Sequence, residues 1–322
     1  MTNGAPQVRT DIRPRLAEMK HLASATSDRP DGLMVEASRR RPARVNPPEH
    51  FVGRGGYDGD FLAGFMVVLP APQGARARDV TPVGADSSGR LDYQHFSVVM
   101  SASRRMAMFT AVNIEGARSV SIPREDDAWF LDGRIPIDAQ LGEEFYAGNR
   151  LDRGHLVRRE DPNWGTAAGL ANVDTFHFTN CAPQMDVFNQ QTWLGLENYV
   201  LQNARAWNER CSVFTGPVFR AADLPYRGAL VPRSFWKVVA FLSDDGRPSA
   251  TAYVVEQDHE LIGLEAAFGR YKTFQRSIRH VENLSGISFG ELARFDGFSN
   301  EELALGGLSI SAEINEFSDI RV

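Results

Sequence analysis

Apolar residues along the chain follow two kinds of pattern, and the first predicts β-strands. The segments with β-type composition or strict alternation are residues 61–69, 95–100, 106–112, 174–179, 212–215, 235–242 and 251–255. The short polar segment 101–105 separates two of them and predicts a hairpin.

The second pattern is helical spacing. Apolar residues recur every three or four positions in 192–207, and again from Thr273 to Leu284, where Ser285-Gly286 predicts the end of a helix. A shorter helix is compatible with residues 15–25. Since strands and helices mix without a regular βαβ rhythm, we expect an α+β fold with a central, mostly antiparallel sheet flanked by helices.

Residues 1–50 differ in composition from the rest of the chain. They hold nine lysines and arginines against six acidic residues, and few large apolar ones. The proline-rich stretch 39–48 predicts an exposed, extended linker. We therefore expect a basic, flexible N-terminal arm at 1–50, either a plain solvated arm or a regulatory one, followed by one folded domain at 51–322.

Composition narrows the class of protein only moderately. The chain has 322 residues, enough for a substantial core, and no apolar run approaches the ~18 residues that a membrane span needs. Without a recognisable signal peptide, Cys181 and Cys211 are expected to be reduced, and the protein to be cytoplasmic. A net charge of −6 does not exclude a nucleic-acid partner, because only the surface that meets the phosphate backbone must be positive.

Candidate chemistry begins in the stretch Leu-Asp-Arg-Gly-His-Leu at 151–156. His155 follows a glycine, which frees the backbone to present the imidazole, and an ordinary histidine pKa of ~6.5 suits proton transfer at neutral pH. Arg153 could pair with a phosphate oxygen, and Asp152 could anchor the segment. A lone histidine is more often structural, but this combination favours a catalytic one.

A second candidate segment runs over residues 179–197. Asn189, Trp193 and Glu197 are spaced four apart, so a helix would place an amide oxygen and a carboxylate along one face. Mg²⁺ prefers few protein oxygens and several waters, which fits one asparagine ligand with a nearby acid. The alternative is that Asn189 caps the helix and Glu197 is a solvated acid.

Taken together, the two segments resemble the DNA/RNA non-specific endonuclease family of the ββα-metal (His-Me finger) superfamily. The resemblance covers about residues 57–295. The residues that carry it are 152–155, Thr179-Asn180, Pro183-Gln184, Phe188-Asn189-Gln190, Trp193 and Leu196-Glu197, with weaker matches at 215–219 and 231–237. It implies a ββα-metal motif and a metal-dependent, sequence-nonspecific endonuclease that acts on DNA, with RNA as a further substrate, and leaves 5′-phosphates.

The resemblance also implies roles for individual residues. His155 matches the general base, Asn189 the single protein ligand of Mg²⁺, Mn²⁺ or another divalent ion, and Glu197 the acid that holds a metal-bound water. Arg153 matches the arginine near the phosphate, while Asn180 and Gln184 match polar supports of the site. An upstream arginine, Arg124 or Arg118, would face the transition-state charge. Val157-Arg158-Arg159 departs from the family pattern, and its arginines would either widen the backbone-binding surface or pair with Glu160 and Asp161.

Other residues invite weaker hypotheses. His177 alternates with aromatics and is expected in the core or an interface, Cys181 is expected to be buried and inert, and no partner can be identified for His95 or His280. The alternative to an enzyme is a catalytically inactive nuclease fold that serves as a nucleic-acid-binding or scaffold protein.

Partners and control are the last expectations. Homodimers are common in the family, so a homodimer is expected, and no membrane contact is. An active cytoplasmic nuclease would threaten its own genome, as in a defence or toxin-type effector. The arm would then mediate restraint, through a regulatory protein or through a protease that cuts at Arg39-Arg40-Arg41.

Overall fold

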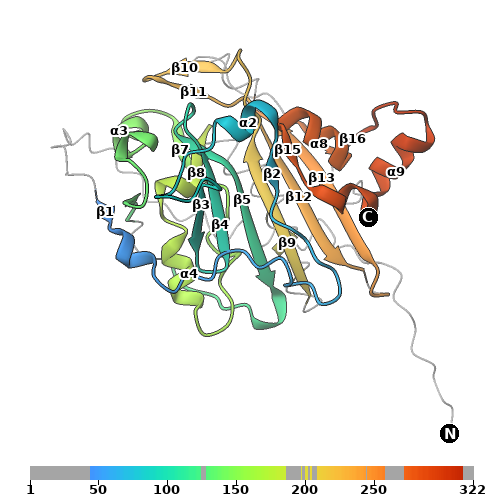
Figure 1. The fold of residues 1–322 in the computed structure, drawn as a ribbon, viewed down its shortest axis with the longest axis horizontal. Helices are drawn as coiled ribbons and strands as arrows, with labels where there is room; N and C mark the ends of the chain where they lie inside the picture. The colour runs from blue at the N-terminus through green and yellow to red at the C-terminus, as the bar shows by residue number, and fades with distance from the viewer. Residues whose placement is uncertain are drawn as a thin grey trace, which may run out of the picture.

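An antiparallel sheet of eight strands forms the centre of the molecule (Figure 1). The computed structural model describes residues 44–124, 128–185, 197, 200–201, 204, 209–243, 245–257 and 272–314. Across the sheet the strands are β16 (Ser311–Ile314), β14 (Lys272–Arg276), β13 (Pro248–Glu256), β12 (Ser234–Leu242), β9 (Arg210–Pro217), β5 (Met106–Glu115), β4 (Phe96–Ser101) and β3 (Arg90–Tyr93). The expected α+β class with a mostly antiparallel sheet is confirmed.

Four two-stranded pairs and short helices surround this sheet. The pairs are β1 (Val45–Asn46) with β6 (Leu131–Asp132), β2 (Ala71–Pro72) with β15 (Ile287–Ser288), β7 (Leu151–His155) with β8 (Cys181–Met185), and β10 (Leu224–Tyr226) with β11 (Ala229–Val231). The α-helices are α2 (Gly74–Arg78), α3 (Glu143–Tyr146), α4 (Ala168–Asp174), α8 (Ile278–Ser285) and α9 (Gly297–Ala304). The 3₁₀ turns are η2 (Pro48–Phe51), η3 (Gly116–Arg118), η4 (Ile137–Ala139), η5 (Phe178–Asn180) and η7 (Gly290–Phe295). No helix among the described residues is both long and apolar enough to cross a membrane.

The two faces of the sheet carry different layers. Phe214 and Trp236 pack against Phe289, which lies between α8 and η7. On the opposite face, η5 and β8 contact β5. Figure 1 shows the same division, with α8 and α9 at one side and α3, α4, β7 and β8 at the other. Both faces are therefore buried, which explains why the central strands read as nearly continuous apolar runs rather than as clean alternation.

Several predicted strands are confirmed. The hairpin of β4 and β5 matches the prediction for 95–112, with a bulge between Val99 and Met100. β9, β12 and β13 contain the predicted segments 212–215, 235–242 and 251–255.

Two predicted strands are wrong. Residues 61–69 form a loop held by a Leu62–Phe65 bridge, and their apolar composition reflects burial of Phe61, Phe65 and Val67. Residues 174–179 connect α4 to η5 instead. There the fully buried Asp174 accepts hydrogen bonds from Arg54 and from the Gln94 backbone. A polar side chain thus lies where the alternating pattern of a strand would place an apolar core residue.

The predicted helix at 273–284 is partly right. Its first residues form β14, and α8 begins only at Ile278, because Ser277 caps it by accepting a hydrogen bond from the His280 backbone. The helix ends as predicted at Gly286, which has a φ of 73°. Of the predicted helix 192–207, only residues 197, 200, 201 and 204 are described, and all four are helical. Residues 15–25 lie outside the described residues.

The last residues of the predicted N-terminal arm pack on the domain. β1 pairs with β6 in parallel, and the ring of Phe51 lies 3.7 Å from the Arg134 guanidinium carbon. The Asn46 side chain reaches His177, with 2.9 Å between Asn46 Nδ2 and His177 Nε2. The described part of the predicted arm, 44–50, thus packs on the fold, while the division of the chain at residue 50 stays a prediction.

His177 is a neutral core histidine, as expected. It is fully buried, and burial lowers its pKa from the ordinary histidine value. Its Nδ1 lies 2.8 Å from the Asp174 carbonyl, which can only accept a hydrogen bond. Nδ1 therefore carries the proton, and Nε2 accepts from Asn46.

Asn46→Ala should destabilise the protein by about 1–3 kcal/mol, because it leaves the buried His177 Nε2 without its donor. Denaturant unfolding would measure the loss. Asn300→Ala removes an exposed asparagine bonded to the Arg294 carbonyl and should change stability by less than about 0.5 kcal/mol. Equal effects from the two substitutions would contradict the account of this contact.

Candidate functional site

The two candidate sequence segments meet in one antiparallel pair of strands. β7 pairs with β8 so that Asp152 lies opposite Gln184, Arg153 opposite Pro183, and His155 opposite Cys181. The structure thus brings residues 152–155 beside Asn180 and Gln184, as the resemblance implied. β7 and β8 form an antiparallel pair at the place where the resemblance implies the two strands of a ββα-metal motif.

Asn180 fixes the backbone where the chain leaves β7. Its side-chain oxygen accepts a hydrogen bond from the Val157 backbone at 2.9 Å. Its amide nitrogen donates to the carbonyls of Val157 and Thr175, both at 3.0 Å. Asn180 is fully buried, and its own carbonyl accepts from the Leu156 backbone. The bonds to Leu156 and Val157 fix the backbone directly after His155, so Asn180 is placed to support the site.

His155 is partly exposed and lies among aromatic rings, with its Nε2 buried. Its ring centroid is 4.8 Å from that of Trp129 and 5.2 Å from that of Phe176, which it meets edge to face. Because His155 and Arg153 are two residues apart on a strand, they project from the same face. Trp129 contacts both, with the Arg153 guanidinium carbon 5.9 Å from its ring centroid. Trp129 therefore holds the two candidate catalytic side chains side by side.

Arg153 forms an ion pair that a ligand can replace. Its guanidinium pairs with Glu143 at the start of α3, and both side chains are partly exposed to solvent. Exposed ion pairs of this kind contribute only ~0–1 kcal/mol. A phosphate oxygen could therefore compete for Arg153 at low cost.

Gln184 lies directly beneath Gly154. It is fully buried, and neither atom of its side-chain amide finds a hydrogen-bond partner among the described residues. A Cβ at Gly154 would lie 2.0 Å from Gln184 Oε1. The glycine is thus required for packing, and Gln184, which lies opposite Asp152, occupies the face of the β7–β8 pair that points away from His155 and Arg153.

Glu197 is buried rather than solvated. It is 6% exposed, and its Oε1 lies 3.6 Å from Nζ of Lys237, a residue that sequence reasoning did not single out. A buried lysine cannot be recognised from the pattern of its neighbours; the only signal was its place in the matched stretch 231–237.

A divalent ion would need oxygen donors here. Asn189, the expected ligand, lies outside the described residues, and those residues contain no cluster of three or more histidine, cysteine or acidic side chains that could hold a metal. The carboxylate of Glu197 is a hard oxygen donor, the kind that Mg²⁺ prefers. The residues present therefore fit a weakly coordinated hard ion, not a thiolate or imidazole site.

Of the two upstream arginines, Arg118 contacts Trp164. The Arg118 guanidinium carbon lies 5.7 Å from the ring centroid of Trp164, and Arg124 is exposed. In the departing stretch, Arg159 bonds the Ile122 carbonyl and pairs with Glu160 at 3.1 Å. Pairing with acids is thus the observed role of Arg159.

The remaining sequence candidates are structural. Cys181 and Cys211 are free, buried thiols, and burial raises the pKa of Cys181 to about 12, so the expectation of an inert thiol is confirmed. His95 stacks on Trp164 with ring centroids 3.4 Å apart and bonds the Pro162 carbonyl through Nδ1. Burial lowers the pKa of His95, which keeps it neutral.

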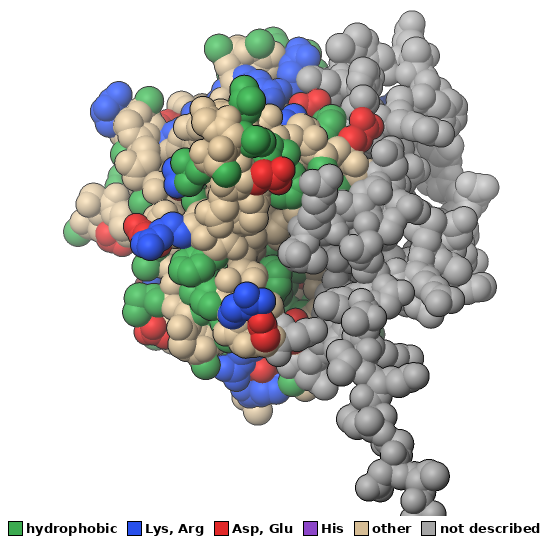
Figure 2. All heavy atoms as spheres, turned by 90° about the vertical axis from the view of Figure 1, so that its right-hand side faces the viewer, with side chains coloured by type: hydrophobic (Ala, Val, Ile, Leu, Met, Phe, Trp, Pro, Cys, Tyr) green, Lys and Arg blue, Asp and Glu red, His purple; other side chains and the backbone are tan. Residues whose placement is uncertain are grey.

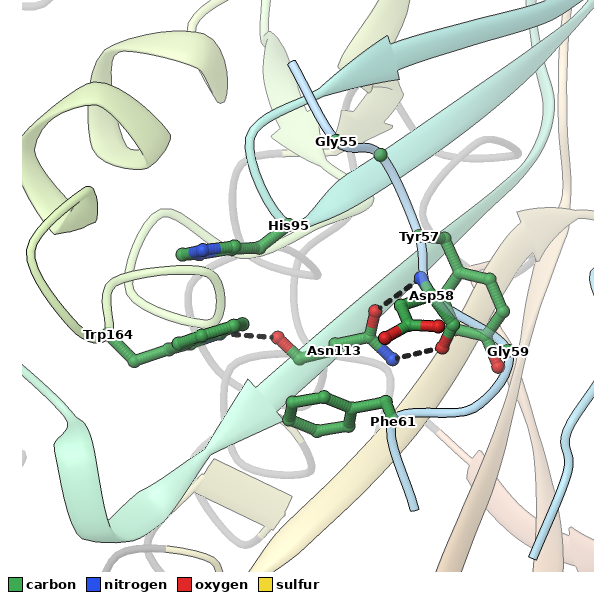
Figure 3. A pocket seen from close by; sticks show the side chains of 9 residues that line it. Gly55, Tyr57, Asp58, Gly59, Phe61, His95, Asn113 and Trp164 are labelled. Atoms are coloured by element: carbon green, nitrogen blue, oxygen red, sulfur yellow. Dashed lines mark hydrogen bonds between the residues drawn. The ribbon is translucent and has the colours of Figure 1, made fainter. Parts of the chain in front are cut away.

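A cavity of about 390 Å³ lies beside this His95–Trp164 stack (Figure 3). Asp58, Phe61 and Asn113 line it as well, and the Trp164 indole donates a hydrogen bond to the Asn113 carbonyl. None of the predicted site residues lines this cavity. It is therefore separate from the β7–β8 site.

Surface charge does not mark a binding face in the view of Figure 2. On the described part of that face, arginine and acidic side chains are scattered among apolar ones without a continuous patch of one sign.

Comparison with known proteins identifies similar sequences. The family model for DNA/RNA non-specific endonuclease matches residues 76–294. The chain is 45% identical over 295 residues to the uncharacterized protein y4fB of Sinorhizobium fredii, a match that covers 83% of this chain and 44% of that protein. It is 30% identical over 158 residues to mitochondrial endonuclease G of Homo sapiens, covering 45% of this chain and 50% of the relative. The chain spans about half the length, or less, of the curated relatives it matches.

A similar solved structure is that of the EndoG/EndoGI complex. It is 18% identical in sequence, with a TM-score of 0.51, and the match covers 62% of this chain and 84% of the other. At this identity the likeness shows the fold.

Gly154→Ala should displace Gln184 and weaken the β7–β8 pair. We expect a loss of about 1–3 kcal/mol, the usual cost of overpacking a buried position. Gly169→Ala on α4, where a new Cβ meets nothing within 4 Å, is the matched control and should leave the melting temperature unchanged or raise it. Adding Gln184→Ala to Gly154→Ala should recover part of the loss; if it does not, the contact with Gln184 is not the cause.

Proposed function

Because the chain belongs to the DNA/RNA non-specific endonuclease family, we propose that it hydrolyses phosphodiester bonds of DNA, and of RNA, without sequence preference and with a divalent ion. The observation that carries the proposal is the pairing of β7 with β8. It sets His155 and Arg153 on one face beside Trp129, over the polar supports Asn180 and Gln184.

In the proposed reaction His155 acts as the general base. Its imidazole takes a proton from a water molecule, whose oxygen then attacks phosphorus as the bond to the 3′-oxygen breaks, and the departing 3′-oxygen takes a proton from solvent. Trp129 and Phe176 pack against the imidazole and restrict its rotation. The ring is therefore already oriented before the reaction begins. The products would carry 5′-phosphates and free 3′-hydroxyls.

Arg153 would bind the phosphate. It can exchange its exposed partner Glu143 for a phosphate oxygen, and a guanidinium matches two such oxygens at once. Contacts to the backbone alone carry no base information, which accounts for the absence of sequence preference.

Asn189 would hold the ion directly, and Glu197 would hold it through water. Such an ion, Mg²⁺ or Mn²⁺, offsets the negative charge that develops on the phosphate and on the departing 3′-oxygen. Arg124 or Arg118 would contribute positive charge upstream.

We also propose that residues 1–43 restrain the domain. The proposal rests on the basic composition of this segment and on its attachment at β1. β1 pairs with β6, two residues after Trp129, so the arm joins the domain next to the residue that contacts His155. The EndoG/EndoGI structure concerns inhibition of EndoG in a complex, a precedent for control of this fold by protein contacts.

His155→Ala should reduce cleavage of plasmid DNA about 10²–10⁴-fold, the usual contribution of a general base, while sparing the fold. Initial rates with Mg²⁺, with Mn²⁺ and with a chelator would measure it. His280→Ala, on α8 at the opposite face of the sheet, is the matched histidine control and should cleave at the original rate. If the unaltered protein cleaves neither DNA nor RNA with any divalent ion, the enzyme proposal fails and an inactive binding protein is favoured.

A chain beginning at Arg44 should cleave at least about fivefold faster than the full chain, as a regulatory coupling of ordinary size would produce. Cutting at Arg44 keeps β1 and its pairing with β6 intact, so thermal unfolding should be unchanged. Equal or lower rates for the shorter, folded chain would rule out restraint by the arm.

A further inference from the structure

The buried lysine of β12 occupies a special place in the sheet. Lys237 is 1% exposed, and it stands opposite Thr215 of β9 on one side and Tyr253 of β13 on the other. The same row continues to Thr110 of β5 and Gln275 of β14. A line of buried polar side chains therefore crosses five strands.

This polar row lies on the face that carries the candidate site. Thr110 is two residues from Val112, which pairs with Phe96, and Phe96 stacks on Tyr93. The Tyr93 hydroxyl in turn bonds Thr179 of η5. Because alternate residues of a strand share a face, Thr110, Thr215 and Lys237 all project toward the layer of η5 and β8.

The ammonium group has defined partners. Nζ donates a hydrogen bond to Thr215 Oγ1 at 2.9 Å and lies 3.6 Å from Glu197 Oε1. Asp161, 5% exposed, is a further acid nearby; burial raises its pKa, and the charges of Lys237 and Arg158 partly oppose that shift. A buried ammonium is tolerated only with such compensation.

The identity of the residue supports a specific role. The chain contains three lysines, at positions 20, 237 and 272, and 32 arginines among its 35 basic residues. A chain that uses arginine for nearly every cation places a lysine here. Lysine is a compact point charge, whereas arginine would bring a planar fork with five donors, more than this row can satisfy.

We propose that Lys237 is a positioning residue that holds the Glu197 carboxylate in its place at the ion site. The proposal rests on the proposed function, in which Glu197 holds the divalent ion through water. Lys237 does not touch substrate. It anchors one carboxylate oxygen from the sheet side, so that the other oxygen can hold a water ligand of the ion.

A double-mutant cycle tests this role. The variants are Lys237→Met, Glu197→Gln and the two combined, and the readouts are the dissociation constant for Mn²⁺ by calorimetry and the rate of plasmid cleavage. Supporting residues of ion sites typically contribute 10–100-fold, so we expect Lys237→Met to weaken Mn²⁺ binding about tenfold and to slow cleavage about 10–100-fold. In the Glu197→Gln background it should have no further effect beyond about twofold.

Thr110→Val is the matched control, because it removes a buried hydroxyl from the same row without touching the ion pair. It should leave both readouts unchanged. If Lys237→Met does not yield folded protein, Thr215→Val, which removes the hydroxyl that Lys237 bonds, takes its place with the same expected dependence on Glu197.

Two results would overturn the proposal. Losses that multiply in the combined variant would show that Lys237 acts independently of Glu197. Unchanged Mn²⁺ binding and cleavage in folded Lys237→Met would show that it has only a structural part. Failure of the unaltered protein to cleave nucleic acid would contradict the proposed function instead, so the two failures are distinguishable.

Discussion

The pairing of β7 with β8 is the constraint on which the candidate site depends. It brings His155 opposite Cys181 although 26 positions separate them. The Asn180 side chain stabilises this arrangement, because it accepts a hydrogen bond from the Val157 N–H and donates one to the Val157 carbonyl. Gly154 allows Gln184 to lie directly beneath the strand, since any side chain there would collide with it. A loop carrying the same residues without this partner would not hold His155 and Arg153 on one face.

Buried polar groups, more than apolar packing, locate the site within the fold. The core of the sheet would tolerate many apolar rearrangements of similar volume. By contrast, Asp174 with Arg54, Asp132 with Arg134, and Glu197 with Lys237 are buried pairs that require particular partners. Such pairs add little net stability, because desolvation offsets their attraction, but a misplaced partner would leave a buried charge uncompensated. They restrict how the layers on either side of the sheet can be arranged.

The sequence predicts the long apolar strands and the candidate catalytic residues better than it predicts buried polar contacts. Long apolar strands such as β5 and β12 are visible from composition, and the residues of 152–155 and Asn180 from their resemblance to a family. Segment 174–179 misled because alternation cannot show that Asp174 is buried by bonding to Arg54, 120 positions away. The start of α8 was not predicted, because Ser277 acts as a helix cap through a hydrogen bond from the His280 backbone that the sequence does not show. The roles of Lys237 and Trp129 were not predicted, since they come from long-range contacts.

The central claim is that the imidazole of His155 does the proton transfer in backbone hydrolysis. Chemical rescue tests it most directly: the cleavage rate of His155→Ala on DNA with Mg²⁺ is measured with and without added free imidazole. The expected rate is about 10²–10⁴-fold below that of the unaltered protein, restored in part by imidazole, which would take the place of the removed side chain beside Trp129. A His155→Ala protein that cleaves at the original rate would contradict the account.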